Sequence, residues 1–202
     1  MHIELKSLKS ESQIKNISNV LKTEYVVECE EAQIKESSNR FEGWWSTTNY
    51  EHGVSFSIIN ARFNGDVTFT TPYPDQPLIY FVYNAGSEVQ LYLSKTDVLR
   101  LSNRNSAIIV SNRNKPINMH FSKNERQELV YLQIIPKLIH KKIHCELETM
   151  PEIIKKIFEA PLEVGGFNVK FATPIQVTTL IQDTMTTQLQ GLERKLLLES
   201  NL

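Results

Sequence analysis

Apolar and polar residues alternate along the middle of the chain, with turn-forming residues between the alternating runs. Val54–Ile58 alternates strictly, and Val67–Thr70 alternates again after Asn64-Gly65. A period of two places successive side chains on opposite faces of a strand. Further apolar runs follow at Leu78–Tyr83, Val89–Leu93, Ala107–Val110, Ile117–Phe121 and Glu128–Ile135. Many short strands without an intervening helical pattern predict an antiparallel sandwich or barrel of the jelly-roll kind.

The residues between the runs predict how some of these strands connect. Asn64-Gly65 supplies the positive φ angles of a two-residue type I′ turn, so we expect a hairpin between the strands on either side of it. The proline-rich segment 71–77 predicts a loop, because proline cannot donate to a strand ladder. Asn84-Ala85-Gly86 predicts a further turn.

The first 49 residues are mixed. Ile14, Ile17 and Leu21 keep helical spacing, whereas Tyr25–Val27 and Gln33–Lys35 resemble short strands. The aromatic cluster at residues 41–45 ends in Trp44 and Trp45. Such a pair either caps the mouth of the barrel, lines a pocket, or places one ring in the core and leaves the other half-exposed.

After Pro136 the apolar period becomes helical. Ile153, Ile157 and Phe158 are among the residues with this spacing, and Pro151 suits a first helical turn. Thr173-Pro174 predicts a helix start, with the threonine as N-cap and the proline at the first helical position. We therefore divide the chain into residues 1–136, an N-terminal segment plus the barrel, and residues 137–202, a helical region truncated before a further domain.

Two apolar stripes in this helical region contain more apolar residues than one helix face needs in order to pack on a barrel. We predict that part of their surface forms a two-fold homodimer contact. The candidate dimerisation residues are Leu180, Met185, Leu189, Leu192 and Leu196.

Composition narrows the function. The 202 residues are 41% hydrophobic and carry a formal charge of −1, and no run of Lys or Arg exceeds two residues. Proteins that bind nucleic acid by themselves normally present a basic face, so we expect no direct DNA binding by this chain. The apolar runs are too short to span a bilayer, and the start of the chain has no signal-peptide pattern. We therefore expect a cytoplasmic protein without membrane contact, in which Cys29 and Cys145 form no disulfide.

Candidate catalytic chemistry is sparse. Barrels of the cupin type often bind a metal through His-x-His together with a glutamate and another histidine, and this sequence has no His-x-His. His140 and His144 have the i, i+4 spacing of two metal ligands, but they lie in a lysine-rich segment that is better explained as a solvated face. No nucleophile elbow, phosphate loop or dinucleotide fingerprint occurs. The sequence therefore predicts no metal, no cofactor and no enzymatic activity.

Some aromatic and polar residues are candidates for lining a ligand cavity, since such cavities combine apolar walls with a few polar anchors. The solvent face of a barrel explains the polar ones equally well. The candidate ligand-binding residues are Trp44, Trp45, Arg62, Tyr80, Tyr92 and His120.

The order of these features resembles the sensor half of AraC-type transcription regulators. The run of strands at residues 54–135 is followed by Phe171–Pro174, a helix, and the leucine-rich segment Gly191–Leu202 with its Arg-Lys-Leu sequence. Within that family the chain is most similar to the branch that includes the siderophore-responsive pyochelin regulator. The resemblance covers most of the chain as a pattern, and its motif-like part is confined to the last dozen residues.

The resemblance implies a cupin-like barrel that binds a small-molecule effector and a pair of helices that dimerises. It also implies control of a helix-turn-helix DNA-binding domain, which this chain lacks, so DNA binding belongs to the parent protein. Two alternatives remain at this point. One is a cupin metalloenzyme, either an isomerase or a dioxygenase, and the other is a carbohydrate-binding or purely structural sandwich.

Overall fold

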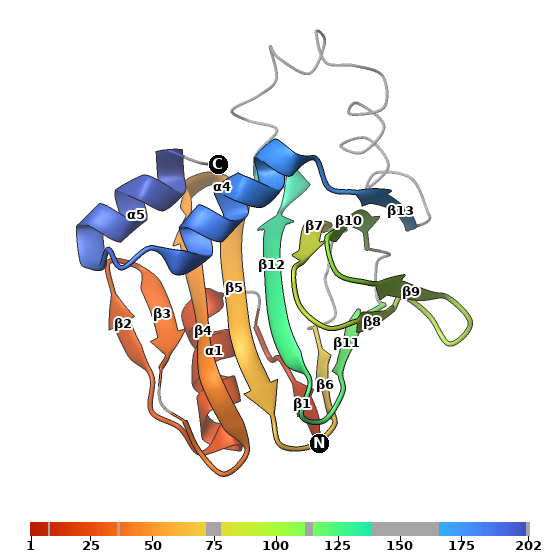
Figure 1. The fold of residues 1–202 in the computed structure, drawn as a ribbon, viewed down its shortest axis with the longest axis horizontal. Coiled ribbons are helices and arrows are strands. Elements are labelled where there is room, and N and C mark those ends of the chain that lie inside the picture. The colour runs from red at the N-terminus through yellow and green to blue at the C-terminus, as the bar shows by residue number, and fades with distance from the viewer. Residues whose placement is uncertain (8, 36, 72–77, 112–114, 139–165, 201–202) are drawn as a thin grey trace, which may run out of the picture.

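The described part of the chain forms two β-sheets that face each other. The structure is a computed structural model, and it describes residues 1–7, 9–35, 37–71, 78–111, 115–138 and 166–200. The larger sheet has the strand order β13-β10-β7-β12-β5-β4-β3-β2, and the smaller has the order β1-β6-β11-β8-β9 (Figure 1). All neighbours pair antiparallel except β1 and β6, which are parallel. The chain therefore has the antiparallel sandwich that the alternating pattern predicts, followed by C-terminal helices, in keeping with the cupin-like barrel that the resemblance implies.

The element bounds agree with most of the predicted runs. The strands are β1 (His2–Glu4), β2 (Val26–Glu28), β3 (Glu31–Ile34), β4 (Phe41–Tyr50), β5 (Val54–Phe63), β6 (Val67–Thr70), β7 (Ile79–Asn84), β8 (Val89–Tyr92), β9 (Val98–Leu101), β10 (Asn105–Val110), β11 (Asn118–Phe121), β12 (Arg126–Ile134) and β13 (Phe167–Ala172). The helices are α1 (Ser10–Leu21), α4 (Ile175–Thr186) and α5 (Gly191–Ser200), with a 3₁₀ turn at Glu51–Gly53.

Aromatic side chains from both sheets form the centre of the core. The Phe63 ring on β5 stacks on Phe121 of β11, with centroids 5.5 Å apart, and lies 5.8 Å from Phe69 of β6. Trp45 on β4 meets Phe69 edge to face at 5.0 Å. Helix α1 packs against β3 and β4 and adds Ile14 and other buried residues to the same cluster. In the described part of the chain, α1 is the helix that contributes to this core, and no residue of α4 or α5 belongs to it.

The predicted hairpin at Asn64-Gly65 is wrong. β5 pairs with β4 and β12 in the larger sheet, whereas β6 pairs with β1 and β11 in the smaller one. Gly65 does not have the positive φ of a type I′ turn. The Asn64 side-chain amide instead donates to the backbone oxygen of Asn39 at 3.0 Å, and the carboxylate of Asp66 accepts from the backbone nitrogen of Lys123 at 2.8 Å. The turn takes the chain from the larger sheet to the smaller one, because the apolar faces of β5 and β6 cover the core from opposite sides.

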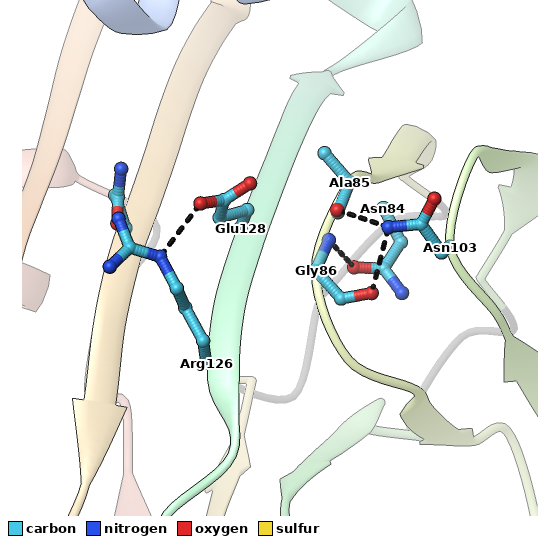
Figure 2. A network of polar contacts seen from close by, with 7 residues as sticks. Asn84, Ala85, Gly86, Asn103, Arg126 and Glu128 are labelled. Carbon is cyan, nitrogen blue, oxygen red and sulfur yellow. Dashed lines mark hydrogen bonds and ion pairs between the residues drawn. The ribbon is translucent and has the colours of Figure 1, made fainter.

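The predicted turn at Asn84–Gly86 is confirmed and is held by a network of amides (Figure 2). The buried Asn84 side chain accepts from the backbone nitrogen of Gly86 at 3.1 Å and donates to the backbone oxygen of Leu101 at 2.7 Å. Asn103 donates to the backbone oxygens of Ala85 and Gly86. A Cβ on Gly86 would lie 2.4 Å from the backbone nitrogen of Glu128, so this close approach requires glycine. The network joins the turn after β7 to the turn before β10.

Two features of the C-terminal part differ from the sequence prediction. β13 pairs with β10 over six residue pairs, so the region after residue 136 contains a strand of the larger sheet as well as helices. The N-cap of α4 is Pro174 and not Thr173, whose hydroxyl lies 2.7 Å from that of Ser106. The boundary at residue 136 stays a prediction. The expected helical residues between Ile139 and Phe158 lie outside the described residues.

Candidate functional site

Among the described residues, the side chains between the two sheets leave little space. A cavity of about 20 Å³ remains, which is room for a single water molecule and far below the ~300 Å³ of a small-molecule site. Its lining residues are Leu5, Gln13, Thr71, Tyr80, Val82, Leu91, Ile109, Ile117, Met119, Tyr131 and Gln133. Of the predicted ligand-binding residues, Tyr80 alone belongs to this lining.

Two tyrosines are among the polar residues that line this small cavity. Burial raises the pKa of Tyr131 to about 12 and also raises the pKa of Tyr80, because the interior disfavours the phenolate. Both phenols therefore stay neutral at physiological pH and act as hydrogen-bonding groups only. The interior is better suited to packing and one ordered water than to binding a ligand.

A larger groove lies on the outer side of the barrel, where the link between α4 and α5 passes over β2, β3 and β4 (Figure 1). Its volume is about 570 Å³, within the range of small-molecule sites. The outward faces of the three strands form its floor, and the C-terminal helices form its wall. Its lining residues are Glu28, Gln33, Lys35, Trp44, Ser46, Met185–Gly191 and Arg194.

Arg194 fastens α5 to the barrel beside this groove. Its Nε lies 3.0 and 3.1 Å from the two carboxylate oxygens of Glu31, and its guanidinium carbon lies 5.9 Å from the centroid of a Trp44 ring. Arg194 is 6% exposed and Glu31 is 4% exposed. Removing either partner of such a buried pair would destabilise the packing, because the other charge would stay buried without a counter-charge. The contact therefore fixes the position of α5 on β3.

The predicted dimerisation residues lie mainly on the outward side of the C-terminal helices. Leu192 and Leu196 on α5 are 61% and 56% exposed, and Leu180 on α4 is 40% exposed. Leu189 and Met185 line the groove together with Trp44, so the structure brings these three predicted residues to one place. The arrangement leaves dimerisation itself a prediction.

The remaining predicted ligand-binding residues do not line the groove. Trp45 is buried in the core, so the aromatic pair has one buried ring and one half-exposed ring. Arg62 is exposed on β5. The Tyr92 hydroxyl donates to Gln90 at 2.8 Å, and His120 Nδ1 lies 3.1 Å from the Thr68 hydroxyl.

Sequence reasoning missed the charged residues that lie in the groove or beside it. Glu31, Lys35 and Arg194 look like ordinary surface charges in the sequence, because each sits among other polar residues. Glu31 and Arg194 are 163 residues apart, and no local pattern links them.

Metal ligands do not gather within the described residues, where no three His, Cys, Asp or Glu side chains are grouped to hold an ion. His140 and His144 lie outside the described part. Cys29 is exposed, and Cys145 is not among the described residues. No helix in the described part is long and apolar enough to cross a membrane.

Comparisons with known proteins give distant structural similarities only. No family model and no curated protein matches the sequence. ToxT from Vibrio cholerae strain SCE256, an AraC-family regulator solved with a bound unsaturated fatty acid, is 11% identical with a TM-score of 0.37 over 76% of this chain and 48% of its own. Bacterial pirin YhhW from Escherichia coli, in complex with nickel(II), is 10% identical with a TM-score of 0.35 over 76% and 56%. The cupin domain of Schizosaccharomyces pombe Cnp3 is 9% identical with a TM-score of 0.34 over 56% and 82%.

These likenesses extend to the fold and no further. The chain spans about half the length of ToxT and of pirin. One prediction needs correction here: the sequence excluded an enzyme, whereas the cupin-fold proteins similar to this chain include enzymes. The exclusion fails because catalytic cupins are defined by residues converging in space, which short sequence motifs do not reveal.

Proposed function

We propose that this chain is the effector-sensing and dimerising half of a bacterial AraC-type transcription regulator of the pyochelin-regulator branch. In this proposal the protein acts in the cytoplasm as a homodimer through α4 and α5. DNA is bound by a separate helix-turn-helix domain, whose activity the effector controls through the position of these helices.

The proposal depends on one observation, the exposure of three of the five apolar residues of α4, whereas Ile181 and Met185 are half-buried. The buried side chains of α4 are Thr178 and Thr184, whose hydroxyls donate to backbone oxygens one turn earlier at 3.2 and 2.8 Å. Its apolar residues Ile175, Val177 and Leu180 are exposed. A surface helix normally turns its apolar stripe towards its own core, so this stripe is suited to a second surface.

A second copy of the chain is the best match for that surface. Asp183 is the only charged residue of α4, and the centres of protein interfaces are likewise depleted in charge. The exposed leucines of α5 extend the same apolar surface, and a two-fold axis lets one such surface pack on its own copy. Burying each leucine would contribute about 1.5–3 kcal/mol to association.

Replacement of both Leu192 and Leu196 by Glu tests the dimer. The wild-type chain is expected at twice its 23.3 kDa mass by light scattering, and the double variant is expected at 23.3 kDa. Gln182→Glu is the matched control, because it adds a charge at an exposed polar position of α4 and should leave the dimer intact. A wild-type monomer, or a dimer that survives the double substitution, would refute the proposal.

A further inference from the structure

We propose that the outer groove between β2–β4 and the α4–α5 link is the binding site for a small organic anion, with a carboxylate or phosphate group attached to an apolar body. This inference deepens the proposed function, on which the ligand's role as effector rests. It moves the binding site from the interior of the barrel to its outside.

The size of the groove separates it from the interior. Its volume of about 570 Å³ accommodates a small organic molecule, whereas the inter-sheet cavity of about 20 Å³ holds one water. The groove is also formed jointly by the barrel and the C-terminal helices. A ligand in it would contact both parts without unpacking the core.

The guanidinium of Arg194 supplies the anion-binding group. Its Nε is used by Glu31, while its two terminal nitrogens have no hydrogen-bond partner among the described residues. The residue lines the groove although it is 6% exposed. Paired donors of this geometry match the oxygens of a carboxylate or a phosphate.

The charges along the groove place the anion at one end. Glu31 balances the single charge of Arg194, so Lys35, just after β3, is the cation of the groove lining with no such partner among the ion pairs of the described residues. Because Ile34 pairs with Trp45, Lys35 lies across from Trp44. Glu28 pairs with Glu31 across β2 and β3 and would lie 2.9 Å from a Cβ on Gly191, so it stands at the Arg194 end of the groove. The anion is therefore expected between Lys35 and Arg194, on the Lys35 side and away from Glu28 and Glu31.

The apolar part of the ligand has its own contacts. Trp44, Met185 and Leu189 line the groove from the strand side and from the helix side. The Trp44 ring can pack against a flat apolar group, and the flexible thioether of Met185 can pack against apolar groups of irregular shape. A bound molecule would hold the α4–α5 link against β4. If it binds the docked arrangement of the helices more tightly than the undocked one, it shifts the population towards the docked arrangement.

Calorimetric titration of the 202-residue chain with benzoate and phenyl phosphate tests the site, with benzamide as the neutral analogue of the same shape. We expect saturable binding of at least one anion and none of benzamide. Arg194→Gln and, separately, Lys35→Gln should each weaken binding about tenfold, the loss of one charge-assisted hydrogen bond. Lys195→Gln is the matched control, since it removes the neighbouring charge of α5, which pairs with Glu30 outside the groove lining, and should leave affinity unchanged.

The outcomes separate the two proposals. No binding of either anion, equal binding of benzamide, or wild-type affinity in Lys35→Gln would overturn the groove as an anion site, even with the dimer intact. Lys35 is exposed, so its variant remains informative if Arg194→Gln disturbs the docking of α5. Binding that depends on both cations in a chain that is monomeric would support the site and refute the dimer alone. Preference for benzoate over phenyl phosphate, or the reverse, identifies the anionic group.

Discussion

The interior of the barrel and the face formed by α4 and α5 use apolar residues in opposite ways. Inside, Phe63, Phe69 and Phe121 are fully buried by partners from both sheets of the same chain. On the helices, Leu192 and Leu196 are exposed, whereas Arg194 and Leu198 are the buried residues of α5. The barrel thus completes its own core, whereas the helical face is left to be covered by another surface.

This difference separates stability from assembly. Substitutions in the aromatic cluster should affect folding of the chain, because no other molecule contributes to that core. Substitutions on the helical face should affect docking and association, since its residues bury little surface within one chain. Three measurements test this separation within the single chain.

The largest effect is expected in the core. Phe63→Ala should lower the free energy of unfolding by about 3–5 kcal/mol, because it removes a ring that stacks on Phe121 and leaves a cavity between the sheets. Urea unfolding followed by circular dichroism measures the change. Val26→Ala is the control at an exposed strand position and should change stability by less than ~0.5 kcal/mol. Equal losses in both variants would contradict a self-contained core.

A smaller and local effect is expected at the base of α5. Glu31→Gln should weaken the docking of α5 by about 3 kcal/mol, because Arg194 would remain buried without its counter-charge. Hydrogen exchange should therefore speed up in α5 and stay unchanged in β5. Glu30→Gln is the matched control: its partner Lys195 lies at the surface, so exchange in α5 should change little. Faster exchange throughout the barrel would show that α5 is part of the same cooperative unit.

The smallest effect concerns the buried phenols. The folded chain raises the pKa of Tyr131 from 10.0 to about 12, so its contribution to stability is complete below pH 10 and is lost as the pH rises towards 12. The free energy of unfolding should therefore decline over that interval, and tyrosinate absorbance should report a late-titrating group. Tyr131→Phe should flatten the decline. Titration of all 7 tyrosines near pH 10 would contradict the packed interior.

Prediction from sequence succeeded where local pattern and burial agree. The alternating runs between Val54 and Ile134 became strands, and Ile14, Ile17 and Leu21 became the buried face of α1. It failed at Asn64-Gly65, where both neighbouring strands were correct but their pairing was not. A turn motif records the local φ preference of two residues, and burial of the flanking strands in different sheets outweighs that preference.

Prediction of the candidate site was weaker for a related reason. Trp44, Met185 and Leu189 were identified as functional candidates, but for two separate roles, and only the folded chain places them in one groove. Tyr80 was expected to line a ligand cavity and lines a space the size of one water. The volume of a cavity depends on how side chains from many strands fill it, and no single segment contains that information.

By itself, the sequence determined the strand-rich barrel, the helical C-terminal part and the apolar stripes, because each follows from the spacing of residues within one segment. The tertiary structure decided which side of α4 faces the barrel, which strands pair across Asn64-Gly65, and that Arg194 meets Glu31 across 163 residues. These outcomes depend on contacts between distant segments, where desolvation and charge pairing select one arrangement among several that the local patterns allow.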